Sequence, residues 1–185
     1  MPLYEVCHSI ELSREQKEAL VGFLTHAHST AFLTPTLFVN VRFTRPEPSG
    51  DFYVGGKARE PNSPNRILAM VRVGPTRPKE KYDELGIAIQ NKWNEVVGYP
   101  DDPKELGSAE KRQERREKKL HAVVFYPMNA AIENGVIIPD PNGEGTWLKD
   151  NMSFFKEQAE DYHDDEFRDL LKEIEDRAEL KKLLQ

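Results

Sequence analysis

The chain has 185 residues and a net charge of −6, and 31% of its residues are charged. This length is enough for one domain with a sizeable core. No run approaches the ~18 apolar residues that a spanning helix needs, so the sequence disfavours a membrane protein. The negative overall charge disfavours nucleic-acid binding. We therefore expect neither a membrane nor a nucleic acid as a partner.

Cysteine usage and the amino terminus indicate the compartment. The single cysteine, Cys7, cannot form a disulfide within the chain. The first residues show no basic stretch followed by an apolar one, which a secretory signal needs. Both features predict a cytoplasmic protein. Cys7 lies in an apparent strand, which favours a small buried residue over a reactive nucleophile.

The first part of the chain has a β-α-β pattern. A strand is predicted over residues 3–8, and Ser13 and Gln16 then form a capping-box pattern that opens a helix. The apolar side chains that follow have helical spacing and share one face: Leu20, Phe23, Leu24 and Ala27. A second strand is predicted over residues 37–43. Residues 51–56 resemble a short hairpin arm with a glycine bend.

The same pattern occurs a second time. A strand over residues 66–72 precedes a helix that Gly98 caps, and a return strand covers residues 121–126. A helical crossover implies parallel, right-handed pairing of the strands on either side of it. The two units predict an α/β (α+β) fold, in which a four-stranded sheet carries two helices on one face. The other face needs a cover, for which a partner subunit is the natural candidate.

Two segments lie outside these units. Residues 101–119 contain thirteen charged residues in nineteen, with glutamates among the cations, and this predicts a solvated helical or mobile insertion rather than a nucleic-acid patch. Residues 155–185 are predicted as a helix that packs on its own or a neighbouring subunit. The last thirty residues hold eleven acids and six bases. We expect a main domain over 1–151 and a C-terminal helical extension over 152–185.

Pro2 is the most informative single residue. Methionine is normally removed from a Met-Pro start, which leaves a free secondary amine at the beginning of a strand. An α-amino group titrates near pH ~8, and desolvation or nearby cations lower that pKa. Such a nitrogen serves as an acid or base near neutral pH without any side chain. A processing signal with no further purpose is the alternative.

Four charged or titratable residues are further candidates. Arg72 and Arg77 form a guanidinium pair that can hold a carboxylate, or they are surface charges. His28 is expected at the end of the first helix, where it either compensates the helix dipole or binds a ligand. Glu133 precedes a turn, where a glutamate is usually solvated.

Metal ligation is not expected. His26 and His28 are two residues apart, so they do not share a helix face. The stretch Tyr162–Asp165 is the only other candidate, and a solvated acidic helix explains it. The sequence therefore predicts no metal and no cofactor.

These residues together resemble the tautomerase superfamily, and within it the cis-3-chloroacrylic acid dehalogenase-like group. The resemblance spans residues 2–151, with 101–119 as an insertion. The matching stretches occur in order along the chain: Pro2-Leu3-Tyr4, Leu24–His28, Phe38–Phe43, Tyr53–Gly56, Arg72-Val73-Gly74 with Arg77, Glu133-Asn134-Gly135, Asn142–Gly145, Trp147, and Asp150-Asn151.

The resemblance implies a homotrimer in which Pro2 is the catalytic amine. It also implies that Arg72, Arg77 and His28 bind a small carboxylate substrate, and that Glu133 activates water with the help of a tyrosine. The sequence departs from the family pattern at two places. Pro75-Thr76 looks inserted between the arginines, which is expected to displace Arg77. The tyrosine position aligns with Phe125, whereas Tyr126 faces the opposite side of the strand unless the register shifts by one.

Three functions follow from this interpretation. The first is a cofactor-free keto-enol tautomerase that acts on small α-keto, enol or unsaturated carboxylates. The second is a hydratase, dehalogenase or decarboxylase of three-carbon unsaturated acids, which needs Glu133. The third is a non-catalytic trimeric interaction protein that binds through the charged insertion and the acidic C-terminal segment.

Overall fold

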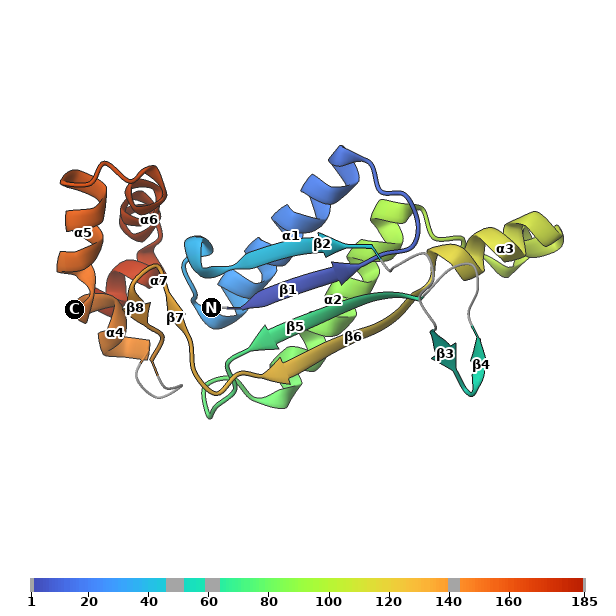
Figure 1. Cartoon of the computed structure of the whole chain (residues 1–185), viewed down its shortest axis with the longest axis horizontal. Helices are drawn as coiled ribbons and strands as arrows, with labels where there is room; N and C mark the ends of the chain where they lie inside the picture. The colour runs from blue at the N-terminus through green and yellow to red at the C-terminus, as the bar shows by residue number, and fades with distance from the viewer. Residues whose placement is uncertain (1, 46–51, 59–63, 140–143, 185) are drawn as a thin grey trace.

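A four-stranded sheet forms the centre of the protein. The structure, a computed structural model, describes residues 2–45, 52–58, 64–139 and 144–184. The strands lie in the order β2-β1-β5-β6. Their bounds are Leu3–Cys7 for β1, Asn40–Thr44 for β2, Asn65–Val71 for β5 and Leu120–Pro127 for β6. β1 pairs in parallel with β2, β5 pairs in parallel with β6, and β1 runs antiparallel to β5 (Figure 1). The predicted sheet of two β-α-β units is confirmed.

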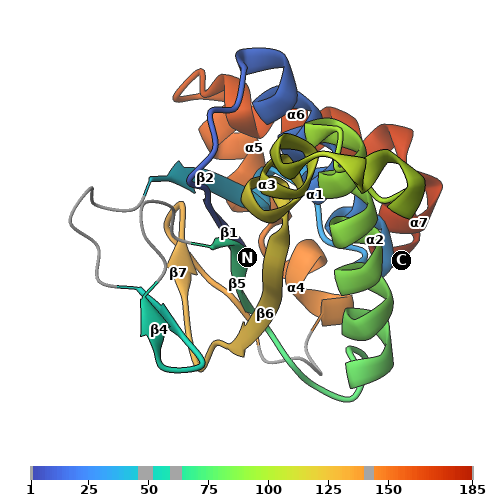
Figure 2. The ribbon, with the colours of Figure 1, turned by 90° about the vertical axis from the view of Figure 1, so that its right-hand side faces the viewer.

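Helices α1 (Arg14–Phe32) and α2 (Lys79–Val97) lie together on one face of this sheet (Figure 2). The capping box of Ser13 and Gln16 opens α1, and Gly98 ends α2 with a φ of 59°. Alternate strand residues, such as Tyr4 and Val6 of β1, are fully buried against the helices. The main core therefore lies between the sheet and the two helices.

The opposite face of the sheet, called the open face below, has large apolar side chains that the described residues leave partly exposed. Leu68 and Met70 of β5 lie beside Val124 and Tyr126 of β6 on this face. Met70 is 43% exposed and Tyr126 is 48% exposed. Alternation along these strands therefore produces a second apolar surface, away from the helices.

Two excursions leave the sheet. Strands β3 (Tyr53–Val54) and β4 (Lys57–Ala58) form the predicted hairpin, and Gly55 and Gly56 supply the positive φ angles of its turn. Its predicted first residue, Asp51, lies outside the described residues. The charged insertion forms a 3-10 turn, η2 (Pro103–Gly107), and a helix, α3 (Ala109–Lys118), that buries none of its residues. The insertion is thus a solvated helix, as predicted.

The last part of the chain forms a small hairpin and a set of helices. The hairpin joins β7 (Ile132–Glu133) to β8 (Val136–Ile137). The helices that follow are α4 (Glu144–Asp150), α5 (Met152–Glu160), α6 (Asp165–Asp176), α7 (Ala178–Lys181) and the 3-10 turn η3 (Lys182–Leu184). The C-terminal segment is helical, as predicted, but it is not one helix. His163 has a φ of 57°, and Asp164 caps the start of α6.

These helices enclose a second hydrophobic core. Phe38, in the 3-10 turn η1 (Thr36–Phe38), packs there with side chains from β8, α4, α5, α6 and α7. The core combines residues from both sides of the predicted boundary at 151–152. The C-terminal segment therefore packs against its own chain. Within the described ranges, no helix is both long and apolar enough to cross a membrane.

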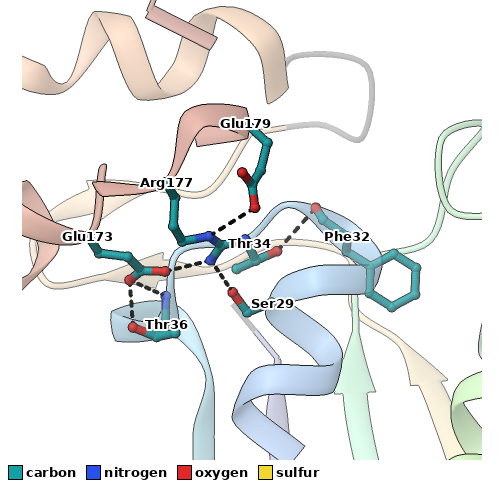
Figure 3. Close-up of polar contacts among 7 residues, drawn as sticks. All are labelled: Ser29, Phe32, Thr34, Thr36, Glu173, Arg177 and Glu179. Carbon is teal, nitrogen blue, oxygen red and sulfur yellow. Dashed lines mark hydrogen bonds and ion pairs between the residues drawn. The ribbon is translucent and has the colours of Figure 1, made fainter. Parts of the chain in front are cut away.

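Polar contacts join the C-terminal segment to the end of α1 (Figure 3). Arg177 Nη1 donates to Ser29 Oγ at 2.5 Å and contacts the Glu173 carboxylate at 2.6 Å. Glu173 Oε2 accepts hydrogen bonds from the backbone N–H of Thr36 at 2.8 Å and from its hydroxyl at 2.5 Å. Residues more than one hundred positions apart are thereby held together.

Candidate active site

Pro2 lies immediately before β1, in the interior of the sheet. Its carbonyl accepts a hydrogen bond from the backbone N–H of Asn40 at 3.0 Å. β1 has neighbours on both sides, so its start is held by β2 and β5. Pro2 is buried in the single chain. The residue predicted to supply the catalytic nitrogen is therefore held by the backbone of a central strand.

His28 is fully buried on α1, where it faces β1. Its Nδ1 lies 2.8 Å from the Tyr4 hydroxyl. Burial lowers the pKa of His28 to about 2, with smaller contributions from Arg77, the chain's amino terminus and Arg72. The imidazole is therefore neutral. α1 continues four residues further to Phe32, so the expectation that His28 ends the helix and compensates its dipole is wrong.

The surroundings of His28 determine which of its nitrogens carries the proton. Burial raises the pKa of Tyr4, so its hydroxyl stays protonated. If that hydroxyl donates to Nδ1, then Nε2 carries the proton. The opposite tautomer would leave the buried Tyr4 O–H without an acceptor among the described residues, which is costly. Nε2 is buried and has no hydrogen-bond partner in the described part of the chain. It is therefore an enclosed N–H donor.

Arg77 is only 5% exposed, despite the two residues inserted before it. Its backbone N–H donates to Gly74 O at 2.9 Å, so Pro75 and Thr76 form the tip of a tight turn. The turn absorbs the insertion and returns Arg77 toward the sheet. Its Nη2 donates to Thr34 Oγ1 at 3.2 Å, and its guanidinium lies 4.9 Å from the centre of the Phe32 ring. Arg77 therefore follows this turn directly and lies beside the end of α1.

Arg72 follows β5 directly and is half-buried. Its Nη1 donates to Pro139 O at 2.7 Å, and its own carbonyl accepts from the Tyr82 hydroxyl at 2.5 Å. Arg72 and Arg77 line the same cavity, whose volume is about 240 Å³. The two guanidinium groups therefore share one space, as the pairing hypothesis requires.

Glu133 lies at the tight turn between β7 and β8, where Asn134 and Gly135 have φ angles of 49° and 82°. Its Oε1 accepts a hydrogen bond from Asn40 Nδ2 at 2.5 Å. Its Oε2 is buried without a hydrogen-bond partner among the described residues. Burial raises the pKa of Glu133, and the Asn40 bond and the charge of the amino terminus act against this rise. Asn40 thus links Glu133 to the backbone of Pro2.

Phe125 and Tyr126 point to opposite faces of β6. Phe125 packs against α2, with its ring centre 5.0 Å from that of Tyr82. Tyr126 lies on the open face beside Met70. The strand therefore has the register in which Phe125 faces the helices. The phenols that contact the candidate residues in the single chain are instead Tyr4, on His28, and Tyr82, on Arg72.

The structure brings the sequence-predicted candidates together only in part. Asn40 bonds to both Pro2 and Glu133, Tyr4 of β1 contacts His28, and Arg72 and Arg77 line one cavity. The described lining of the cavity includes the two arginines, but it does not include Pro2, His28 or Glu133. The Asn142-Gly143 part of the sequence pattern lies outside the described residues.

Sequence reasoning missed the residues that position the candidates, namely Tyr4, Thr34, Asn40 and Tyr82. Tyr4 and Asn40 were noted only as parts of short stretches. Strand alternation places Tyr4 on the helix-facing side of β1, which is a usable signal. No sequence signal pairs Asn40 with Glu133, 93 positions away.

Across the described residues, no group of three or more His, Cys, Asp or Glu side chains lies close enough to hold a metal ion. The candidate residues themselves offer an amine, a neutral imidazole, a carboxylate and two guanidinium groups.

Known proteins resemble the chain in both sequence and fold. A family described as "Putative oxalocrotonate tautomerase enzyme" matches residues 1–152. The crystal structure of N1, a member of the cis-3-chloroacrylic acid dehalogenase family, has a TM-score of 0.57 at 21% identity, over 79% of this chain and 90% of that one. No relative was found among curated proteins.

Two further solved structures share the fold. The asymmetric trimer of F6, a fused 4-OT, has a TM-score of 0.51 at 17% identity and covers 73% of this chain and 94% of its own. MIF2 of Leishmania major has a TM-score of 0.50 at 14% identity, over 75% of this chain and 97% of that one. At these identities the structural likeness establishes the fold, and the family match over 1–152 establishes the relationship. The chain belongs to the tautomerase superfamily, in the family described as oxalocrotonate tautomerase enzymes.

Proposed function

We propose that the protein is a cofactor-free keto-enol tautomerase that uses the Pro2 nitrogen to move a proton on a small α-keto or enol carboxylate. One observation carries this proposal. Asn40 joins Pro2 to Glu133, because its backbone N–H donates to the Pro2 carbonyl at 3.0 Å and its Nδ2 donates to Glu133 Oε1 at 2.5 Å. One residue therefore holds both the residue that would supply the amine and the candidate carboxylate.

The proposed reaction is a proton shuttle. Once Met1 is removed, Pro2 carries a secondary amine. Pro2 is buried, and burial disfavours the charged form of an amine. The neutral nitrogen takes the proton from the enol oxygen and returns a proton to the adjacent carbon, which yields the keto acid. Positioned proton transfer of this kind contributes about 10²–10⁴-fold to the rate.

The remaining residues bind the substrate and its developing charge. The guanidinium groups of Arg72 and Arg77 hold the carboxylate, because a planar fork of N–H donors matches two carboxylate oxygens. His28 is neutral, so its contribution is a hydrogen bond from Nε2 rather than a charge. These donors also stabilise negative charge on the oxygen of an enolate.

The test of the proton shuttle compares a free with a blocked Pro2 nitrogen. A removable leader joined directly to Pro2 makes that nitrogen a non-basic amide, and cleavage of the leader restores the amine. We expect the blocked protein to turn over an enol carboxylate at least ~10²-fold more slowly, and cleavage to restore the rate. The same leader at the carboxyl terminus is the control and leaves the rate unchanged. Equal rates for blocked and free protein would refute the role of Pro2.

A second candidate function is hydration of a three-carbon unsaturated acid, with loss of halide or carbon dioxide. The observation that favours it is Glu133, whose Oε1 is held by Asn40 while its buried Oε2 lacks a partner among the described residues. An oriented carboxylate of this kind can activate water. We expect Glu133→Gln to abolish hydration and to spare tautomerisation. If neither reaction responds to the substitution, Glu133 is structural.

We further propose that the chain assembles as a homotrimer. The open face of the sheet, which carries Leu68, Met70, Val124 and Tyr126, supports an association between copies of the chain. The solved structure of F6, which shares the fold, is an asymmetric trimer. A neighbouring copy would also bring further side chains near the residues of this face.

A further inference from the structure

Asn40 contacts two candidate residues through two different parts of its structure. Its backbone N–H donates to the Pro2 carbonyl at 3.0 Å, where β1 and β2 begin to pair. Its side chain points to the face of the sheet away from the helices, because Val41 beside it packs against the main core. There its Nδ2 donates to Glu133 Oε1 at 2.5 Å. A substitution at residue 40 therefore removes the contact with Glu133 and keeps the one with Pro2.

The backbone that carries Glu133 is held independently of Asn40. Glu133 shares one face of its hairpin with its cross-strand partner Val136, which is buried in the second core. A Cβ atom on Gly135 would lie 3.2 Å from the ring of Phe154, so this ring packs closely against the turn. Phe154 belongs to α5, in the part of the chain that follows the family match. Because the backbone is fixed in this way, the remaining freedom is that of the Glu133 side chain.

The hydrogen bond from Asn40 distinguishes the two oxygens of the Glu133 carboxylate. It engages Oε1, whereas Oε2 is buried and has no hydrogen-bond partner among the described residues. A buried acceptor without a partner is unfavourable, and a donor such as water relieves that cost. The same bond favours the ionised form of Glu133, against the burial that raises its pKa. Both effects suit a carboxylate that takes a proton from water.

We propose that Asn40 is the positioning residue of Glu133: its side chain directs Oε2 toward water and so sets how far the site hydrates an unsaturated acid instead of only moving a proton. The inference deepens the second candidate function and rests on it for the role of Glu133. Pro2 contacts only the backbone of Asn40, whereas Glu133 contacts only its side chain. The two candidate reactions therefore depend on different parts of one residue.

The first test measures the ionisation of Glu133 without any substrate. In protein made with isotope-labelled glutamate, the Glu133 carboxyl carbon is titrated by NMR, and Glu133→Gln identifies its signal. Asn40→Leu removes the hydrogen-bond donor with a side chain of similar shape. We expect the titration midpoint to rise by about one pH unit, because a hydrogen bond to a charged group changes such an equilibrium by about tenfold. The charge of the amino terminus also acts on Glu133, and it is the same in both proteins.

Thr44→Val is the matched control for this titration. Thr44 also lies on β2, and its hydroxyl donates to a different carboxylate, Glu5, at 3.1 Å. The midpoint of Glu133 should therefore stay unchanged in Thr44→Val. Asn40→Asp is a second variant with the natural shape. It places another acid against Glu133, so the upper midpoint of the pair should lie above the midpoint of Asn40→Leu.

The second test compares the two reactions. Asn40→Leu should lower the kcat of hydration at least ~10-fold and leave its KM nearly unchanged, because a displaced carboxylate loses its alignment with water. Tautomerisation should fall less, because the backbone of residue 40 still donates to Pro2. Equal losses in both reactions would overturn the proposal, and so would an unchanged Glu133 midpoint in Asn40→Leu. The titration needs no turnover, so it still tests Asn40 if blocked and free Pro2 react equally and the tautomerase function fails.

Discussion

Burial gives His28 a chemistry unlike that of an exposed histidine. The side chain is fully enclosed, its Nδ1 contacts Tyr4, and its neighbours include two arginines and the amino terminus. Each of these features disfavours a second proton on the ring. In the proposed reaction, His28 therefore contributes a hydrogen bond rather than a charge, and the proposal assigns the positive charge to Arg72 and Arg77.

The depressed pKa of His28 makes stability depend on pH. In the unfolded chain His28 titrates near its ordinary value of 6.5, whereas in the folded protein its pKa is about 2. Between these values the unfolded state binds the extra proton, so the free energy of unfolding falls as the pH falls from 6.5 toward 2. The contribution of this one group reaches about 1.4 kcal/mol per pH unit. We expect denaturant titrations between pH 7 and pH 4.5 to show that the free energy of unfolding falls more steeply with pH in the natural protein than in His28→Gln.

His26 supplies the control for this experiment. It lies on the same helix, and its side chain is exposed. Carboxylates that titrate in the same pH range contribute equally to the natural protein and to the two histidine variants. The test is therefore the difference between their curves of unfolding free energy against pH. His26→Gln should follow the natural protein. If His28→Gln also follows it, the imidazole is not held neutral in the fold.

At the scale of elements, the contact between α1 and the C-terminal segment depends on Arg177. Its guanidinium lies between Ser29 and Glu173, and its side chain is 21% exposed. Hydrogen bonds to charged groups contribute about 1.5–3 kcal/mol when they are partly shielded from water. We expect Arg177→Leu to lower the free energy of unfolding by about this amount and to speed hydrogen exchange in α7 and η3.

Arg14 provides a comparison on α1. It pairs with Glu18, and the two side chains are 86% and 63% exposed. Exposed ion pairs contribute at most ~1 kcal/mol. Arg14→Leu should therefore leave both the stability and the hydrogen exchange of η3 nearly unchanged. Equal effects of the two substitutions would show that Arg177 acts only as a surface charge.

The elements that were predictable from the sequence have local causes. The capping box at Ser13, the apolar spacing along α1 and the glycine cap at Gly98 lie within a few residues of the structure they specify. The break between α5 and α6 also has a local signal, the Asp164 cap, but the apolar spacing that continues beyond it obscured that signal. Strand pairing was predictable because each crossover contains a helix.

The contacts of the candidate site were less predictable, because they join distant parts of the chain. Arg177 and Ser29 are 148 positions apart, and Asn40 and Glu133 are 93 apart. Their pairing depends on how the packed elements meet, which no local pattern records. The position of Arg77 depends on the geometry of one turn. The sequence alone points to the candidate site residues, whereas the neutral state of His28 follows only from its burial.

At the scale of the whole molecule, the sheet has one face covered by helices and one face open. Helices α1 and α2 cover the first (Figure 2). On the second, Met70 and Tyr126 remain nearly half exposed beside Leu68 and Val124. Contiguous apolar surface of this kind is uncommon on a protein that stays monomeric. It identifies the face on which the proposed trimer would assemble.

A charge at the centre of this face tests the assembly. Met70 is already 43% exposed in the single chain, so Met70→Lys should not disturb the fold of the subunit. In a trimer, the new ammonium group would lose its water without gaining a partner, which is strongly unfavourable. We expect light scattering to give three times the chain mass of 21.3 kDa for the natural protein and the mass of one chain for Met70→Lys. Ile87→Lys is the control, because Ile87 is 63% exposed on α2, in the layer away from the open face. This variant should stay trimeric, and a Met70→Lys protein that keeps the full mass would exclude the open face as the interface.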